Sequence, residues 1–95
     1  MPRFMIKIED TYFMWSTVIN APITAGMTRS RALDYLETEY PNVDKLSCEE
    51  HMTHTDMFGT GNNDWTLDKI LALNCAGDNE TALTLEEILE RYKNG

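Results

Sequence analysis

The sequence predicts an α+β domain of order ββαββα, in which a four-stranded, mainly antiparallel sheet carries two packed helices. Two observations lead to this fold class. Residues 3–24 hold a dense run of apolar and aromatic side chains with strand-like periodicity, and helical apolar spacing follows over residues 29–40 and again near the C-terminus. The 95 residues make one domain, residues 1–95, with no room for a second core.

The N-terminal run predicts a hairpin of two strands. Phe4, Ile6 and Ile8 occupy alternate positions, as in a half-buried strand, and a tight turn follows at residues 9–11. Residues 12–19 carry aromatic and β-branched side chains on both faces, which is typical of a strand covered on two sides. Residues 20–22 would end this strand, because proline cannot donate to a sheet ladder.

Two helices have clear start signals. Thr28 or Ser30 can cap a helix over residues 29–40, which would cover one face of the hairpin. Thr84 and Glu87 form a capping box that opens a last helix. Its inner stripe is predicted to hold Leu85, Ile88, Leu89 and Tyr92.

The middle of the chain is less regular. Residues 46–58 are polar and favour an edge strand, with a short helix as the alternative. Residues 69–74, within the ambiguous stretch 65–74, favour the strand that completes the sheet. Between them, residues 58–64 are rich in glycine and asparagine, but the loop lacks the lysine and the following Ser or Thr of a phosphate-binding P-loop.

Sixteen acidic and eight basic residues give a formal net charge of −8. This balance argues against direct binding of nucleic acid or an anionic membrane, and it fits a basic protein partner or mimicry of nucleic acid. Solubility alone is the simpler explanation. No apolar stretch is long enough for a signal peptide or a membrane span, so we expect a cytoplasmic protein with reduced thiols.

The candidate binding surface is acidic. Carboxylates mark the outer faces of both predicted helices, and the two helices placed side by side would form one negative surface able to steer a basic partner. Plain solvation is the alternative. Trp65, which follows the glycine–asparagine loop, is the aromatic residue that we expect to be partly exposed at an interface. The six predicted carboxylates are Asp34, Glu37, Glu39, Glu86, Glu87 and Glu90.

A second group of residues suggests metal or thiol chemistry. Cys48, His51 and His54 recur at every third position, and Cys75 could join them to give a tetrahedral zinc set. The spacing matches no common zinc finger, and a Cys–His nucleophilic pair would need a third orienting group that the sequence does not show. We therefore predict no catalytic residue, no metal and no cofactor, with these four residues as the weak candidates.

Short distinctive segments mark both ends of the chain: Tyr12 with WSTV (15–18), APIT (21–24) and GMT (26–28), and then NCAG (74–77), Leu83–Thr84 and EEI (86–88). With these segments the chain resembles a group of small bacteriophage-encoded accessory proteins of mostly unassigned function. Residues 41–64 lie outside this resemblance, and it brings no active-site residues. It implies a protein that binds host proteins, including defence systems such as CRISPR effectors and restriction enzymes.

Together these features predict a non-enzymatic protein-binding module that acts in the host cytoplasm. It would bind and modulate or inhibit a host protein through an acidic surface, and a nucleic-acid-binding protein is one such partner. One alternative is a small zinc-binding or thiol-dependent enzyme. Another is a structural or self-assembling accessory protein, monomeric or homodimeric, in which an edge strand near residues 46–57 pairs across a dimer.

Overall fold

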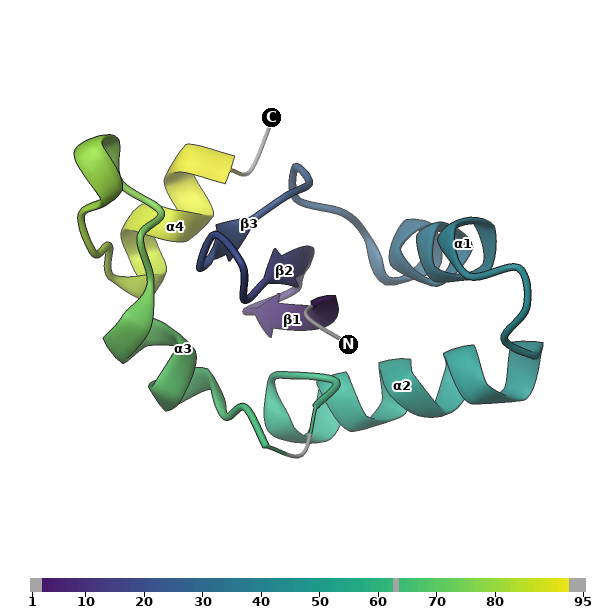
Figure 1. The fold of residues 1–95 in the computed structure, drawn as a ribbon. Coiled ribbons are helices and arrows are strands. Elements are labelled where there is room, and N and C mark those ends of the chain that lie inside the picture. The colour runs from purple at the N-terminus through teal and green to yellow at the C-terminus, as the bar shows by residue number, and fades with distance from the viewer. Residues whose placement is uncertain (1–2, 63, 93–95) are drawn as a thin grey trace.

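The computed structural model describes residues 3–62 and 64–92. Within them, a three-stranded antiparallel sheet lies at the centre of the molecule, with two helices on each side (Figure 1). The α+β class is confirmed, but four helices and three strands replace the predicted two helices and four strands. The elements are β1 (Arg3–Ile8), β2 (Thr11–Ser16), β3 (Ala21–Pro22), α1 (Arg29–Glu39), α2 (Lys45–Phe58), α3 (Leu67–Leu73), the 3-10 turn η1 (Asp78–Glu80) and α4 (Leu85–Tyr92).

The predicted hairpin is confirmed. β1 and β2 pair from Arg3 opposite Ser16 to Ile8 opposite Thr11, and Glu9 in the turn has a positive φ of 56°. β2 ends at Ser16, three residues earlier than predicted, and the chain returns as the short strand β3. Pro22 therefore does not merely end β2: it lies opposite Trp15 in an edge strand, where a missing N–H donor is tolerated.

The hairpin is buried on both faces. Successive strand residues point to opposite sides, so the two faces meet different helices. One side packs against α3 and α4; its buried residues are Phe4, Ile6, Ile8, Phe13, Trp15, Ala21, Ile70, Ala76 and Ile88. The other packs against α1 and α2; its buried residues are Met5, Tyr12, Met14, Ala32, Leu36, Cys48 and Met52. The prediction that the second strand is covered on two sides is confirmed.

The predicted edge strand over residues 46–58 is wrong, and the helical alternative is right. Asp44 caps α2 by accepting the Ser47 N–H at 2.7 Å, and Gly59 ends the helix with a left-handed φ of 84°. Few apolar residues mark the inner face of this helix, which explains the misleading pattern. Its buried positions, Cys48, Met52 and Thr55, nevertheless recur at helical spacing.

The predicted strand over residues 69–74 is also wrong. Thr66 caps α3 by accepting the Lys69 N–H at 3.2 Å, and Ile70 is the fully buried residue of this short helix. Leu71 of this helix is partly exposed, and Leu73 is largely exposed. The segment is therefore not a buried strand, and it does not add a fourth strand to the sheet.

A loop and a side chain cover the outer edge of β1. The Lys7 N–H donates to the Gly59 carbonyl at 2.8 Å, and the Gly61 N–H donates to the Met5 carbonyl at 2.9 Å. The Met5 N–H donates to His51 Nε2 at 3.0 Å. Residues 46–57 are helical, and the backbone groups at this edge of β1 already form hydrogen bonds within the chain. The predicted edge strand that would pair across a dimer is therefore not present.

The remaining helix predictions are confirmed. Thr28 caps α1 by accepting the Arg31 N–H, and the Thr84–Glu87 capping box closes with reciprocal hydrogen bonds of 3.0 and 3.2 Å. Ile88 is fully buried against the sheet, and its neighbours on the predicted inner stripe of α4 pack on the same cluster.

Asp56 links four segments on the α1–α2 side of the sheet. Its carboxylate accepts hydrogen bonds from the Tyr12 hydroxyl and from Arg29 Nε, the latter at 2.8 Å, and Lys7 Nζ lies 3.6 Å away. Burial raises the pKa of Asp56, but the hydrogen bonds from Tyr12 and Arg29 outweigh it and leave the pKa below its ordinary value. The cluster thus ties α2 to both long strands and to the start of α1.

Candidate functional site

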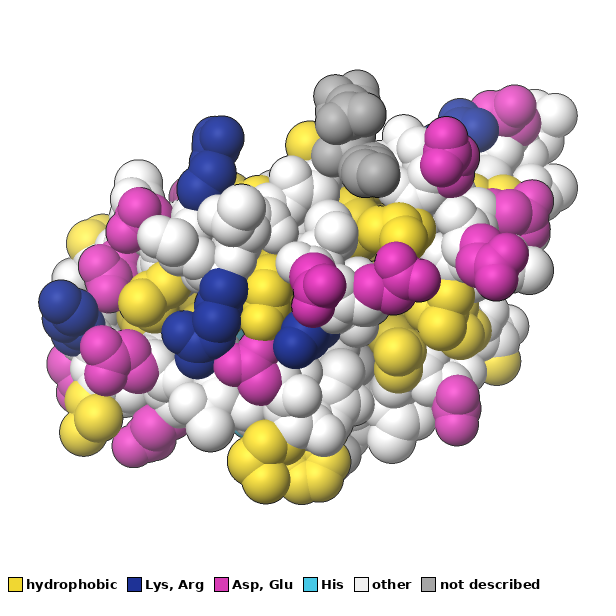
Figure 2. All heavy atoms as spheres, turned by 180° about the vertical axis from the view of Figure 1, so that it is seen from behind, with side chains coloured by type: hydrophobic (Ala, Val, Ile, Leu, Met, Phe, Trp, Pro, Cys, Tyr) yellow, Lys and Arg dark blue, Asp and Glu magenta, His cyan; other side chains and the backbone are white. Residues whose placement is uncertain are grey.

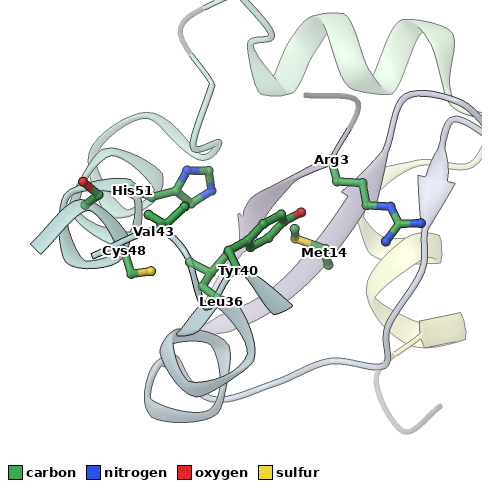
Figure 3. Close-up of a pocket in the computed structure, with 8 residues that line it drawn as sticks. Arg3, Met14, Leu36, Tyr40, Val43, Cys48 and His51 are labelled. Atoms are coloured by element: carbon green, nitrogen blue, oxygen red, sulfur yellow. The ribbon is translucent and has the colours of Figure 1, made fainter. Parts of the chain in front are cut away.

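A cavity of about 120 Å³ lies between α1, α2 and the sheet (Figure 3). It brings together two of the predicted chemical residues, Cys48 and His51, because residues three apart share a helix face. Leu36 and Tyr40, from the end of α1, lie across from them. The lining residues are Arg3, Met14, Leu36, Tyr40, Val43, Ser47, Cys48 and His51.

The surroundings of Cys48 oppose nucleophilic chemistry. Burial raises the pKa of its thiol, and the carboxylates of Glu37, Asp44 and Glu49 raise it further. A reactive cysteine needs the opposite, an electropositive site that lowers its pKa and favours the thiolate. The cavity therefore gives no support to the alternative of a thiol-dependent enzyme.

His51 is engaged in the fold. Its Nε2 accepts the Met5 N–H at 3.0 Å, so this nitrogen is unprotonated in the hydrogen bond that closes the edge of β1. Burial lowers the pKa of His51, and the neighbouring His54 lowers it further. The imidazole acts as a structural acceptor.

This hydrogen bond predicts a specific loss of stability in mild acid. The pKa of His51 is lower in the folded than in the unfolded chain, where it is about 6.5, so the unfolded state binds more protons as the pH falls. The contribution of His51 is thus present above pH of about 6.5 and lost as the pH falls through the folded pKa. Urea unfolding at several pH values should show this loss in the wild type.

The matched control is His51→Gln, whose side-chain oxygen can still accept the Met5 N–H but does not titrate. The free energy of unfolding of this variant should rise relative to that of the wild type as the pH falls below about 6.5. A difference that stays constant with pH would show that protonation of His51 is not coupled to folding.

The other two metal candidates do not complete a site with this pair. His54 Nδ1 lies 2.6 Å from the Thr60 carbonyl oxygen, and its ring packs on Phe58 with centroids 4.7 Å apart. Cys75 follows α3, where its N–H donates to the Asn20 carbonyl. Within residues 3–62 and 64–92, no three His, Cys, Asp or Glu side chains are grouped to hold a metal ion.

The six predicted carboxylates do not form one surface. Asp34, Glu37 and Glu39 lie on α1, whereas Glu86, Glu87 and Glu90 lie on α4, and these helices pack on opposite faces of the sheet. The expectation of two acidic helices side by side is therefore corrected. The carboxylates that lie near α1 are instead those at the start of α2. Glu37 of α1 raises the pKa of Cys48 together with Asp44 and Glu49 from the start of α2, so these three carboxylates lie in one region.

Most of the acidic side chains are not paired with a base. In the described part of the chain, the ion pairs join Asp56 to Lys7 and Arg29, and Asp78 to Arg91. On the face seen in Figure 2, most of the basic side chains lie on the half formed by α1 and α2, whereas acidic side chains lie on both halves. The two predicted acidic faces thus differ in their surroundings.

Trp65 is partly exposed, as predicted. One part of its ring reaches the core, with its centroid 6.3 Å from that of Phe4. Lys69 Nζ lies 4.6 Å from the ring centroid, within cation–π range. Trp65 borders a hollow near Phe58, whose side chain is 61% exposed, so aromatic surface is available at the end of α2.

The sequence reasoning missed a groove between α3 and α4. Its lining residues are Leu71, Ala72, Leu83, Thr84, Leu85 and Glu86. The groove depends on the helical state of residues 67–73, whereas the sequence favours a strand over residues 69–74. The apolar residues at 71, 83 and 85 could have indicated it only once both helices were correctly assigned.

Compared with protein-family models, curated proteins and solved structures, the chain matches none. Across residues 3–62 and 64–92, no helix combines the length and apolar character that crossing a bilayer requires.

Proposed function

We propose that this chain is a non-enzymatic protein-binding module that uses acidic surface to engage a basic site on a partner protein. Following the resemblance to bacteriophage accessory proteins, the partner would be a host protein, such as a CRISPR effector or a restriction enzyme. Mimicry of nucleic acid is the sharpest form of this proposal, because the surfaces that bind nucleic acid are basic.

The observation that carries the proposal is the unpaired acidic surface. Among the described residues, the carboxylates of the outer faces of α1 and α4 take no part in ion pairs, and the chain has a net charge of −8. Such carboxylates can meet Lys and Arg side chains of a partner without first breaking an internal pair. They also accelerate the encounter, an effect that weakens as salt rises.

The cavity chemistry supports a binding role over catalysis. The raised pKa of Cys48 keeps its thiol protonated at neutral pH, and His51 already uses its Nε2 to accept a backbone N–H. Cys48 is therefore a poor nucleophile, and the His51 Nε2 atom is not available to act as a general base.

The test uses three forms of the protein as immobilised baits for a bacterial lysate: the wild type, an α1 variant (D34N, E37Q, E39Q) and an α4 variant (E86Q, E87Q, E90Q). The variants change the formal charge equally and on opposite sides of the sheet, and glutamine at position 87 can keep the capping box. We expect the wild type to retain a host protein at low salt and release it at high salt. One variant should lose that protein and the other should keep it.

Several outcomes would contradict the proposal. Retention of nothing by the wild type would argue against a binding module, and retention by both variants would remove the role of the acidic faces. Equal loss from both variants would indicate a general effect of net charge. Circular dichroism of each bait shows whether the fold survives, which we expect because five of the six substituted side chains are exposed and the sixth, Glu37, is half-buried.

A further inference from the structure

The groove between α3 and α4 has the composition of a docking site for a helix. Its floor is apolar and partly exposed at Leu71, Leu83 and Leu85, and Ala72 beside them is exposed. Leu73, next along α3, is 49% exposed. The hollow is open to solvent, has a volume of about 660 Å³ and lies where the last residues of α3 meet Leu83, Thr84 and the first turn of α4. An open apolar hollow of this kind suits one face of a partner helix more than a small enclosed ligand.

One carboxylate lines this groove, and two more lie one helical turn from its lining residues. Glu86 lines the groove from α4, and Glu90 lies one helical turn further along the same helix. On α3, Asp68 lies one turn before Ala72, a residue of the floor. These three side chains are exposed, and none forms an ion pair with a described residue.

The basic residues of the two helices are directed elsewhere. Lys69 Nζ lies over the Trp65 ring and donates to the Asp64 carbonyl at 3.4 Å. Arg91 donates to the Asp78 carboxylate at 2.6 Å. Neither base therefore neutralises the carboxylates beside the groove. The α1 face differs, because Arg31 lies beside Asp34 along the hollow on that helix.

We propose that the α3–α4 groove binds a basic amphipathic helix of the partner protein. An apolar stripe would fill the floor, and Lys or Arg side chains flanking the stripe would meet Asp68, Glu86 and Glu90. A second copy of this acidic chain fits less well, because its net charge of −8 would oppose the same carboxylates. The inference rests on the proposed function and adds the place of binding and the chemistry of the partner.

The probe is a synthetic helical peptide of leucine and lysine, about four turns long, with leucines at i, i+3, i+4 and i+7. A peptide of the same composition with the leucines scattered around the helix is the control. Each is titrated into the isotope-labelled full chain at about 0.15 M salt, where charges more than about 8 Å apart are largely screened. We expect the amphipathic peptide to shift the amide resonances of α3 and α4, and to bind at least tenfold more tightly than its control.

Two matched variants locate the charge effect. D68N, E86Q and E90Q together should weaken binding of the amphipathic peptide at least tenfold, while D34N, E37Q and E39Q, the same change in charge on α1, should alter it less than twofold. Equal binding of both peptides, shifts centred on α1, equal effects of the two variants or no binding of either peptide would each overturn the inference. A dimer in light scattering whose formation shifts the amide resonances of α3 and α4 would also overturn it.

Failure here can be told apart from failure of the proposed function. If the lysate protein is retained by the D68N, E86Q, E90Q variant and lost by the α1 variant, the chain remains a binding module that uses another face. If the wild type retains no lysate protein although the amphipathic peptide binds the groove, the docking chemistry stands and the proposed biological role does not.

Discussion

Phe13→Ala and Met14→Ala should each destabilise the protein strongly, by about 3–5 and about 2–5 kcal/mol respectively, although the two residues are neighbours in one strand. Phe13 is 0% and Met14 1% exposed, and their side chains point to opposite faces of β2. Phe13 packs with the cluster under α3 and α4, and Met14 with the cluster under α1 and α2. Each truncation therefore opens a cavity in a different layer.

Urea unfolding followed by circular dichroism measures both effects. Val18→Ala is the control, because Val18 lies just past the end of β2 and is 75% exposed, and its effect should stay within about 0.5 kcal/mol. If an alanine variant does not fold at all, Phe13→Leu and Met14→Leu provide milder versions that should rank in the same way against the control. A cost for Phe13 or Met14 as small as that of Val18 would mean that one face of the hairpin is open to solvent.

Gly61→Ala is expected to cost about 2–4 kcal/mol, from overpacking and from the loss of a buried hydrogen bond. A Cβ atom at position 61 would overlap the imidazole ring of His51. The ring cannot turn away without giving up the Met5 N–H, and the loop cannot retreat without breaking the hydrogen bond from the Gly61 N–H to the Met5 carbonyl. Denaturant unfolding of the purified variant measures the cost.

A double-mutant cycle isolates this contact. His51→Ala removes the ring, so Gly61→Ala made in that background should cost less than about 1 kcal/mol, and the two substitutions should be strongly non-additive. Gly59 is the informative comparison, because its φ of 84° makes an alanine there strained whatever His51 does. Additive effects of Gly61→Ala and His51→Ala would show that the two groups do not meet.

The parts of the fold that could be predicted are those that local residues determine. The hairpin follows from side-chain alternation and a turn, α1 from Thr28 and its apolar stripe, and α4 from the capping box. Residues 45–58 could not be assigned in this way, because a helix with few apolar residues is indistinguishable from a polar strand until its neighbours are known. The caps Asp44 and Gly59 were the available local signals.

The candidate site was predicted in part for the same reason. The helical spacing of Cys48 and His51 brought them to one cavity, but their protonation states depend on carboxylates from other segments and on a backbone N–H of β1. The acidic residues were identified from composition, whereas their division between two faces required the sheet to be covered on both sides. The groove between α3 and α4 required a tertiary contact that no single segment encodes.

The separation of the two acidic faces depends on one structural claim: α1 and α2 cover one face of the hairpin, and α3 and α4 cover the other. Nuclear Overhauser contacts of the methyl groups in labelled protein test it most directly. Ile70 and Ile88 should contact the rings of Phe4 or Trp15, and Leu36 should contact Met14. Contacts from Ile88 to Met5 or Met14, with none to Trp15, would contradict this arrangement. They would mean that α1 and α4 cover the same face of the hairpin and that their carboxylates form a single acidic surface.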